Sequence, residues 1–143
     1  MRRVVLDTNV IVSAGLKLGS VPYRVVMDWV LAGQAQAAIC PAVVREYREV
    51  LWRPKFTRHG FPPEWIEDLL ALSLQLPDPV PWPHLLPDPS DAVFLALAKA
   101  AGAWLVTGNL KHFPKTARRG VTVIAPGEYL ERLGEGVRGF EGT

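Results

Sequence analysis

Short apolar runs alternate along the chain with longer segments whose apolar residues recur at helical spacing. The runs have lengths and side chains typical of buried strands, and they occupy residues 4–6, 37–40, 104–106 and 121–124. The helical pattern covers residues 20–31, 41–52, 62–76, 88–102 and a short last segment that ends at Leu133. Continuously apolar strands separated by helices predict a parallel sheet that is covered on both faces.

This pattern predicts a small, doubly wound α/β domain. We expect one domain over residues 1–133 and a flexible, glycine-rich tail over residues 134–143. The stretch from Leu76 to Pro89 contains six prolines, counting Pro89 itself, and they predict an irregular connection there. Ligands of such folds bind at the carboxyl ends of the strands. Polar residues that end strands or begin helices are therefore the first candidates for a site.

Composition narrows the class of protein further. The chain has 143 residues, of which 49% are hydrophobic and 21% charged, as in ordinary globular domains. The single cysteine, Cys40, excludes an internal disulfide framework. No apolar run approaches the length of a membrane span, and Asp7 interrupts any signal-peptide pattern, so we expect a cytoplasmic protein without a membrane partner. The net charge of +2 means that nucleic-acid binding would depend on local cationic patches.

Two candidate residues follow predicted strands. Asp7 comes directly after the run at 4–6, and Asn109 follows Val106 by three residues. A turn or a helix cap would explain Asp7 equally well, and a Gly-Asn turn would explain Asn109. However, the chain has only two asparagines, Asn9 and Asn109, and both fall at predicted strand ends.

Two further candidates lie on predicted helices. Glu46 borders the apolar stripe of its helix, with Ala42 and Val50 four residues away on either side, so no cation on the helix neutralises it. Glu49, in contrast, has arginines at both of these spacings and is typical of a solvated ion-pair row. Asp91 follows Asp88 in a pattern typical of a helix start, and this capping explanation competes with any chemical role.

The residue types favour oxygen chemistry. The three histidines lack the spacing of a zinc site, and the sequence contains neither a phosphate-binding glycine motif nor a nucleophile elbow. Clustered carboxylates repel one another, so at least one pKa among them should rise unless a cation is present. Mg²⁺ prefers such oxygen ligands, keeps several waters and can assist phosphodiester hydrolysis without a histidine nucleophile.

These positions occur within stretches that resemble the PIN domain family of nucleases. The matching stretches are residues 5–10 (VLDTNV), 44–51 (VREYREVL), 88–98 (DPSDAVFLALA) and 105–109 (LVTGN). Residues 51–56 (LWRPKF) are similar to the branch that contains VapC-like toxins of toxin–antitoxin pairs. The resemblance extends over roughly residues 3–130, and its specificity comes from the order and spacing of the four stretches.

The resemblance implies an α/β/α sandwich with a central parallel sheet and an acidic pocket that binds Mg²⁺ or Mn²⁺. It implies a metal-dependent ribonuclease that hydrolyses RNA phosphodiester bonds, is inhibited by a cognate antitoxin and forms a homodimer. By position, Asp7, Glu46 and Asp91 match the metal-holding acids, and Asn109 matches a fourth catalytic position that is often aspartate. Asparagine removes one charge there but keeps a carbonyl oxygen that can bind a metal or orient a water.

Two cationic clusters follow candidate residues and could contact RNA phosphates. The first comprises Arg53, Lys55 and Arg58, and the second comprises Lys111, His112, Lys115, Arg118 and Arg119. Trp82 could stack on a base, although packing explains it more simply.

Two alternatives to the ribonuclease remain. The first is a non-catalytic PIN-like binding module with a partly decayed acidic pocket. The asparagine at position 109, where an acid is common, leaves this alternative open. The second is a phosphotransferase with Asp7 as nucleophile. It is weak because a haloacid-dehalogenase-like enzyme needs an acid two residues later, where Asn9 stands.

Overall fold

The computed structural model describes residues 2–60, 62 and 64–141 and has a five-stranded sheet at its centre. The strand order is β3-β2-β1-β4-β5, and every neighbouring pair is parallel. The strands are β1 (Arg2–Leu6), β2 (Ala35–Ile39), β3 (Leu74–Gln75), β4 (Trp104–Val106) and β5 (Val123–Ile124). The predicted α/β class with a parallel sheet is confirmed.

Helices connect the strands. The α-helices are α1 (Thr8–Leu16), α2 (Val21–Arg24), α3 (Pro41–Leu51), α4 (Pro54–Thr57), α5 (Glu64–Leu72), α6 (Ala92–Ala101) and α7 (Pro126–Glu141). The π-helix η1 (Val25–Leu31) and the 3₁₀ turns η2 (Pro89–Asp91), η3 (Leu110–His112) and η4 (Lys115–Ala117) complete the set. In the described part of the chain, no single helix is long and apolar enough to cross a bilayer; Thr8–Leu16 and Val21–Met27 pass that test only jointly, across a bend of 105°.

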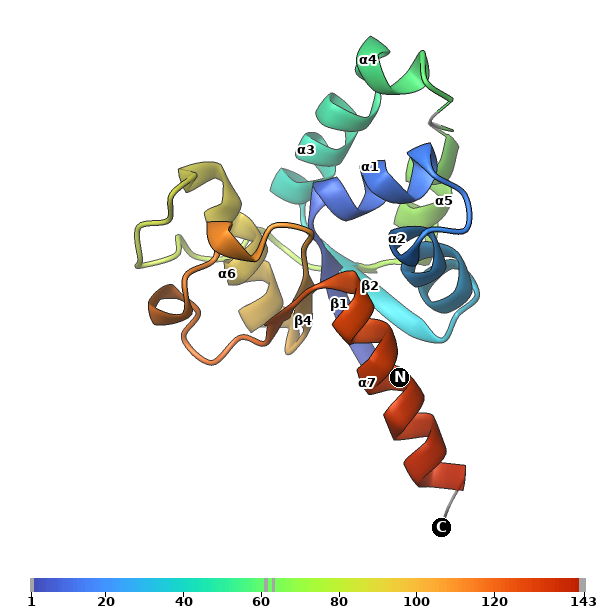
Figure 1. Cartoon of the computed structure of the whole chain (residues 1–143). Helices are drawn as coiled ribbons and strands as arrows, with labels where there is room; N and C mark the ends of the chain where they lie inside the picture. The colour runs from blue at the N-terminus through green and yellow to red at the C-terminus, as the bar shows by residue number, and fades with distance from the viewer. Residues whose placement is uncertain (1, 61, 63, 142–143) are drawn as a thin grey trace.

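The central strands are apolar because both faces of the sheet are covered. Val4, Val5 and Leu6 of β1 are at most 1% exposed, and Leu105 and Val106 of β4 are fully buried. Helix α6 packs against β1, β2 and β4, and α1, α2 and α7 lie on the other side (Figure 1). The result is the expected three-layer α/β/α sandwich.

The strand order reverses direction between β1 and β4. The chain proceeds from β1 outward through β2 and β3, then returns to pair β4 with the opposite side of β1. Leu6 and Val106 are in register at the carboxyl ends of these strands, and the Asp7 backbone N–H donates to the Val106 carbonyl at 2.9 Å. The residues that follow the two strands therefore meet at the place where ligands bind in doubly wound folds.

Helix α3 is fixed to this edge of the sheet by Tyr47. The fully buried Tyr47 hydroxyl donates a hydrogen bond to the Leu6 carbonyl, next to Asp7. At the start of the helix, the Asp78 carboxylate accepts from the Ala42 N–H at 2.9 Å, one of the donors that a helix leaves unpaired. Anchored at both places, α3 holds its central residues beside the end of β1.

The structure corrects several sequence predictions. Helix α1 is an addition to the predicted elements, and the helix expected to reach Leu76 ends at Leu72, because the chain then extends into β3 beside β2. The segment 20–31 is helical but changes to a π-helix at Val25. Pro63, one of two prolines expected to start α5, and tail residues 142–143 lie outside the described residues.

The predicted end of the last helix is also corrected, whereas the flexibility of residues 134–143 stays a prediction. Helix α7 continues to Glu141 instead of ending near Leu133, and Figure 1 shows it projecting beyond the sheet. Glycines in this segment weaken a helix by about 1 kcal/mol each but do not forbid helical backbone angles. The domain boundary at residue 133 stays a prediction.

Two buried tyrosines should respond oppositely to removal of the hydroxyl. Tyr47→Phe should lower the free energy of unfolding by about 1–2 kcal/mol because it removes a buried hydrogen bond. Tyr129→Phe should be neutral or stabilising, since the buried Tyr129 hydroxyl has no hydrogen-bond partner among the described residues. Urea unfolding of both variants measures this difference, and equal losses would contradict the assigned role of Tyr47.

Candidate active site

Asp7 lies at the switch point between β1 and β4 and is only 5% exposed. It occupies the position before α1, but its side chain makes no capping hydrogen bond. Its Oδ2 atom instead accepts from Thr107 Oγ1 at 2.8 Å and from Asn9 Nδ2 at 3.3 Å. The carboxylate therefore faces the residues after β4 as well as the start of α1, and a turn or cap alone does not account for it.

Glu46 and Glu49 share helix α3 but have different surroundings. Glu46 is half-buried, and its Oε2 accepts from Thr8 Oγ1 at 2.6 Å. Glu49 is 75% exposed and pairs with Arg53 at 3.5 Å, as the helical spacing predicts. The predicted contrast between an acid that borders the core and a solvated one is confirmed.

Asp88 and Asp91 divide two roles at the start of α6. Asp88 caps the 3₁₀ turn η2 that leads into α6, since its Oδ1 accepts from the Ser90 N–H at 3.0 Å and from the Ser90 hydroxyl at 2.8 Å. Asp91 is 8% exposed and its side chain makes no capping bond. Its Oδ2 lies 3.0 Å from Nδ1 of His112 on η3. The capping explanation holds for Asp88 and fails for Asp91.

Asn109 joins this arrangement through the loop after β4. Its backbone N–H donates to Thr107 Oγ1 at 3.0 Å, and its Nδ2 lies 2.9 Å from His112 Nε2. The loop approaches the start of α1 closely, because the Gly108 N–H donates to Asn9 Oδ1 at 3.0 Å and an added Cβ would lie 3.3 Å from that oxygen.

A chain of contacts thus connects all four predicted residues. It runs from Asp7 through Thr107 to Asn109 and then through His112 to Asp91, while Thr8, next to Asp7, holds Glu46. The sequence indicated the acids but not their hydroxyl and imidazole partners. The signal that could have identified the hydroxyl partners is their position, since Thr8 and Thr107 lie directly beside predicted strand ends.

Burial raises the pKa of all three acids, and repulsion by neighbouring carboxylates adds to the shift for Glu46 and Asp91. Burial is the largest cause for each, and it raises the pKa of Asp7 although the Thr107 hydroxyl opposes the shift. The charge of Asp7 further raises the pKa of Glu46 and of Asp91, which reaches about 6. None of these carboxylates forms an ion pair with a described lysine or arginine. The site is therefore a partly buried cluster of carboxylates whose negative charge is weakly compensated.

The donor set suits a hard cation, although the described residues form no closed metal cage. No group of three or more His, Cys, Asp and Glu side chains in the described ranges is arranged as a ready metal centre. Mg²⁺ does not require one, since it is commonly bound by one or two carboxylates together with waters and substrate phosphates. The residues fit such an ion by ligand chemistry and by their unneutralised charge.

The raised pKa of Asp91 predicts a pH-dependent gain in stability for Asp91→Asn. A folded-state pKa of about 6, against an ordinary 3.8, means that wild type loses stability as the pH rises between these values. In EDTA, Asp91→Asn should exceed wild type at pH 7.5 by on the order of 1 kcal/mol, and less at pH 4.5.

Asp88→Asn is the matched control for this urea-unfolding series. Hydrogen bonds from Ser90 lower the Asp88 pKa, so this variant should show no gain at pH 7.5. A gain for Asp91→Asn that is independent of pH, or a loss at pH 7.5, would contradict the assigned electrostatics.

Comparison with known proteins assigns the family. The chain is similar in fold to VapBC2 from Rickettsia felis bound to a DNA fragment from their promoter (TM-score 0.61, 18% identity, covering 86% of this chain and 98% of that one). It is also similar in fold to PAE2754 from Pyrobaculum aerophilum (TM-score 0.59, 19% identity, covering 94% of this chain and 90% of that one). A third similar structure is FitAcB from Neisseria gonorrhoeae (TM-score 0.57, 20% identity, covering 86% of this chain and 97% of that one). No curated protein matches the sequence. The PIN domain model matches residues 3–111, and the chain therefore belongs to the PIN domain family.

Proposed function

We propose that this protein is a metal-dependent ribonuclease that hydrolyses RNA phosphodiester bonds, and that it is the toxin of a toxin–antitoxin pair. One observation supports the proposal: Asp7 at the sheet's switch point lies near enough to Glu46 and Asp91 to raise their pKa values, and none of the three pairs with a described lysine or arginine. Such an arrangement is unfavourable without a cation, which is typical of a functional site. Family membership supports the same chemistry.

Asp7, Glu46 and Asp91 would hold Mg²⁺ or Mn²⁺, with the Asn109 carbonyl oxygen as a further neutral ligand or a partner of a bound water. The ion would supply a more acidic water and would stabilise negative charge on the phosphate. The chain's own residues orient the ligands. Thr107 and Asn9 hold Asp7, and Thr8 holds Glu46, so that these carboxylates stay in position before any ion or substrate arrives.

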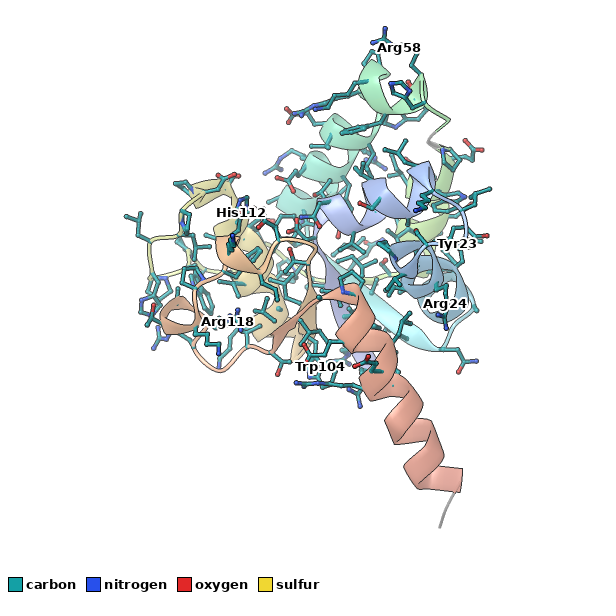
Figure 2. All side chains as sticks on the ribbon, viewed as in Figure 1. Tyr23, Arg24, Arg58, Trp104, His112 and Arg118 are labelled. Carbon is teal, nitrogen blue, oxygen red and sulfur yellow. The ribbon has the colours of Figure 1, made fainter. Side chains whose placement is uncertain are left out.

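The second cationic cluster is better placed to bind the RNA backbone than the first. Arg118 donates from Nε to the Phe113 carbonyl at 2.8 Å, which ties it to the loop that carries His112. Figure 2 shows Arg58 of the first cluster at the far tip of α4, well away from His112, and Arg53 is already paired with Glu49. Trp82 is partly buried against the core and its indole N–H donates to the Ala117 carbonyl at 2.8 Å, so packing accounts for it without a role in base stacking.

The resemblance to VapC-like toxins, together with the fold shared with VapBC2 and FitAcB, supports an antitoxin protein as partner. A cytoplasmic location and a homodimer are further parts of the proposal. A short open reading frame beside the gene would support the antitoxin. Sedimentation of the purified protein tests the dimer.

The direct test is cleavage of RNA by the purified protein in Mg²⁺, in Mn²⁺ and in EDTA. Wild type should cleave with either metal and stop in EDTA, and Asp7→Asn should be inactive while remaining folded. An inactive wild type that still binds an antitoxin would contradict the enzyme and support the binding-module alternative.

A matched pair on α3 tests the site assignment. Glu46→Gln should reduce cleavage at least about 100-fold with little loss of stability, because it removes an anionic ligand but also relieves repulsion within the pocket. Glu49→Gln should cleave nearly as wild type and lose at most a few tenths of a kcal/mol, the usual contribution of an exposed i,i+4 pair. Cleavage rates under one metal condition measure both, and equal rates for the two variants would defeat the assignment of Glu46.

A further inference from the structure

His112 contacts two site residues that lie on different segments. Its Nδ1 is 3.0 Å from Asp91 Oδ2, and its Nε2 is 2.9 Å from Asn109 Nδ2. Figure 2 shows His112 on η3, beside the segment that enters α6. The imidazole therefore bridges the loop after β4 and the start of α6.

The carboxylate determines how the ring and the amide are oriented. Ionised Asp91 can only accept a hydrogen bond, so Nδ1 of His112 carries the proton that it donates. In the neutral ring, Nε2 is then an acceptor, and the group of Asn109 that faces it must be the NH₂. The carbonyl oxygen Oδ1 of Asn109 consequently points away from the imidazole, and no donor among the described residues occupies it.

We propose that His112 is a positioning residue that holds the Asp91 carboxylate and turns Asn109 Oδ1 toward a bound cation or its water. This inference rests on the proposed function, in which those two residues face the metal. It explains how asparagine can serve at a position where an acid is common. An aspartate offers two equivalent oxygens, whereas an asparagine offers one and must be held the right way round.

The imidazole is not what holds η3 in place. The backbone of this turn is fixed by the His112 N–H on the Asn109 carbonyl at 3.1 Å and by the Phe113 N–H on the Leu110 carbonyl at 3.0 Å. Phe113 is fully buried and anchors the turn to the core, whereas the His112 side chain is 40% exposed. Replacement of the imidazole should therefore leave the fold intact and alter the site.

Calorimetric titration of Mn²⁺ without RNA tests this role in four proteins. His112→Ala should weaken Mn²⁺ binding about tenfold relative to wild type, as for other residues that orient metal ligands. The same substitution in an Asn109→Asp background should cost clearly less, because either oxygen of the introduced carboxylate can face the ion without a histidine to orient it. Equal losses in the two backgrounds would overturn the inference.

Two further measurements separate positioning from general damage. His112→Gln keeps an acceptor near the place of Nε2, so it should bind Mn²⁺ more tightly than His112→Ala at a similar melting temperature. Long-range ¹H–¹⁵N NMR of wild type at pH 8 should show the proton on Nδ1 of His112. A proton on Nε2, or equal binding by the Ala and Gln variants, would count against the assigned orientation.

The outcomes distinguish this inference from the proposed function. A wild type that cleaves RNA and binds Mn²⁺ with unchanged affinity in His112→Ala would overturn the role of His112 alone. A wild type that neither binds Mn²⁺ nor cleaves RNA would overturn the proposed function, and the inference with it.

Discussion

The hydroxyl of Thr107 connects the two strand ends on which the candidate site depends. Thr107 is fully buried directly after β4, and its Oγ1 donates to Asp7 Oδ2 while it accepts from the Asn109 N–H. A carboxylate that is 5% exposed needs such a donor, because burial without hydrogen bonds is costly. The same hydroxyl sets the course of the loop that leads to His112. Through these two hydrogen bonds, the residues that follow β1 and β4 are held together as part of one acidic cluster.

The acidic cluster is locally unfavourable within an otherwise well-packed domain, because its carboxylates are partly buried without cationic partners. Burial raises the pKa of Asp7, Glu46 and Asp91, and the charge of Asp7 raises the pKa of the other two further. The apolar layers above and below β1 stabilise the sheet that imposes this proximity. Residues that oppose local stability in this way are typical of functional sites, where a ligand relieves the conflict.

Three of the four candidate residues lie at positions that periodicity in the sequence can locate. Asp7 and Asn109 follow continuous apolar runs, and Glu46 borders a helical stripe, so strand ends and helix faces identified them before any contact was known. The pattern around Asp91 left two explanations open, since a helix start does not by itself distinguish the capping acid from its neighbour. The structure makes that distinction through the hydrogen bonds of Asp88.

Contacts that depend on tertiary structure could not be predicted. His112 is far from Asp91 in sequence, and only the 3₁₀ turn η3 brings its ring beside the start of α6. Helix α1 escapes prediction because Val12 and the exposed Leu16, on the side opposite its buried face, are also apolar, which weakens the amphipathic period. The glycines of α7 predicted an early end, but they lower helix propensity without excluding the helix.

The central proposal is that the acidic cluster binds one cation, with Asp7 and at least one of Glu46 and Asp91 as direct ligands. Crystals grown with Mn²⁺ and measured for anomalous scattering would locate the ion directly. The account predicts a strong peak within about 2.5 Å of carboxylate oxygens from Asp7 and at least one of Glu46 and Asp91, with waters in the remaining positions. A pocket that stays without an anomalous peak at millimolar Mn²⁺, or an ion bound only elsewhere on the protein, would contradict it.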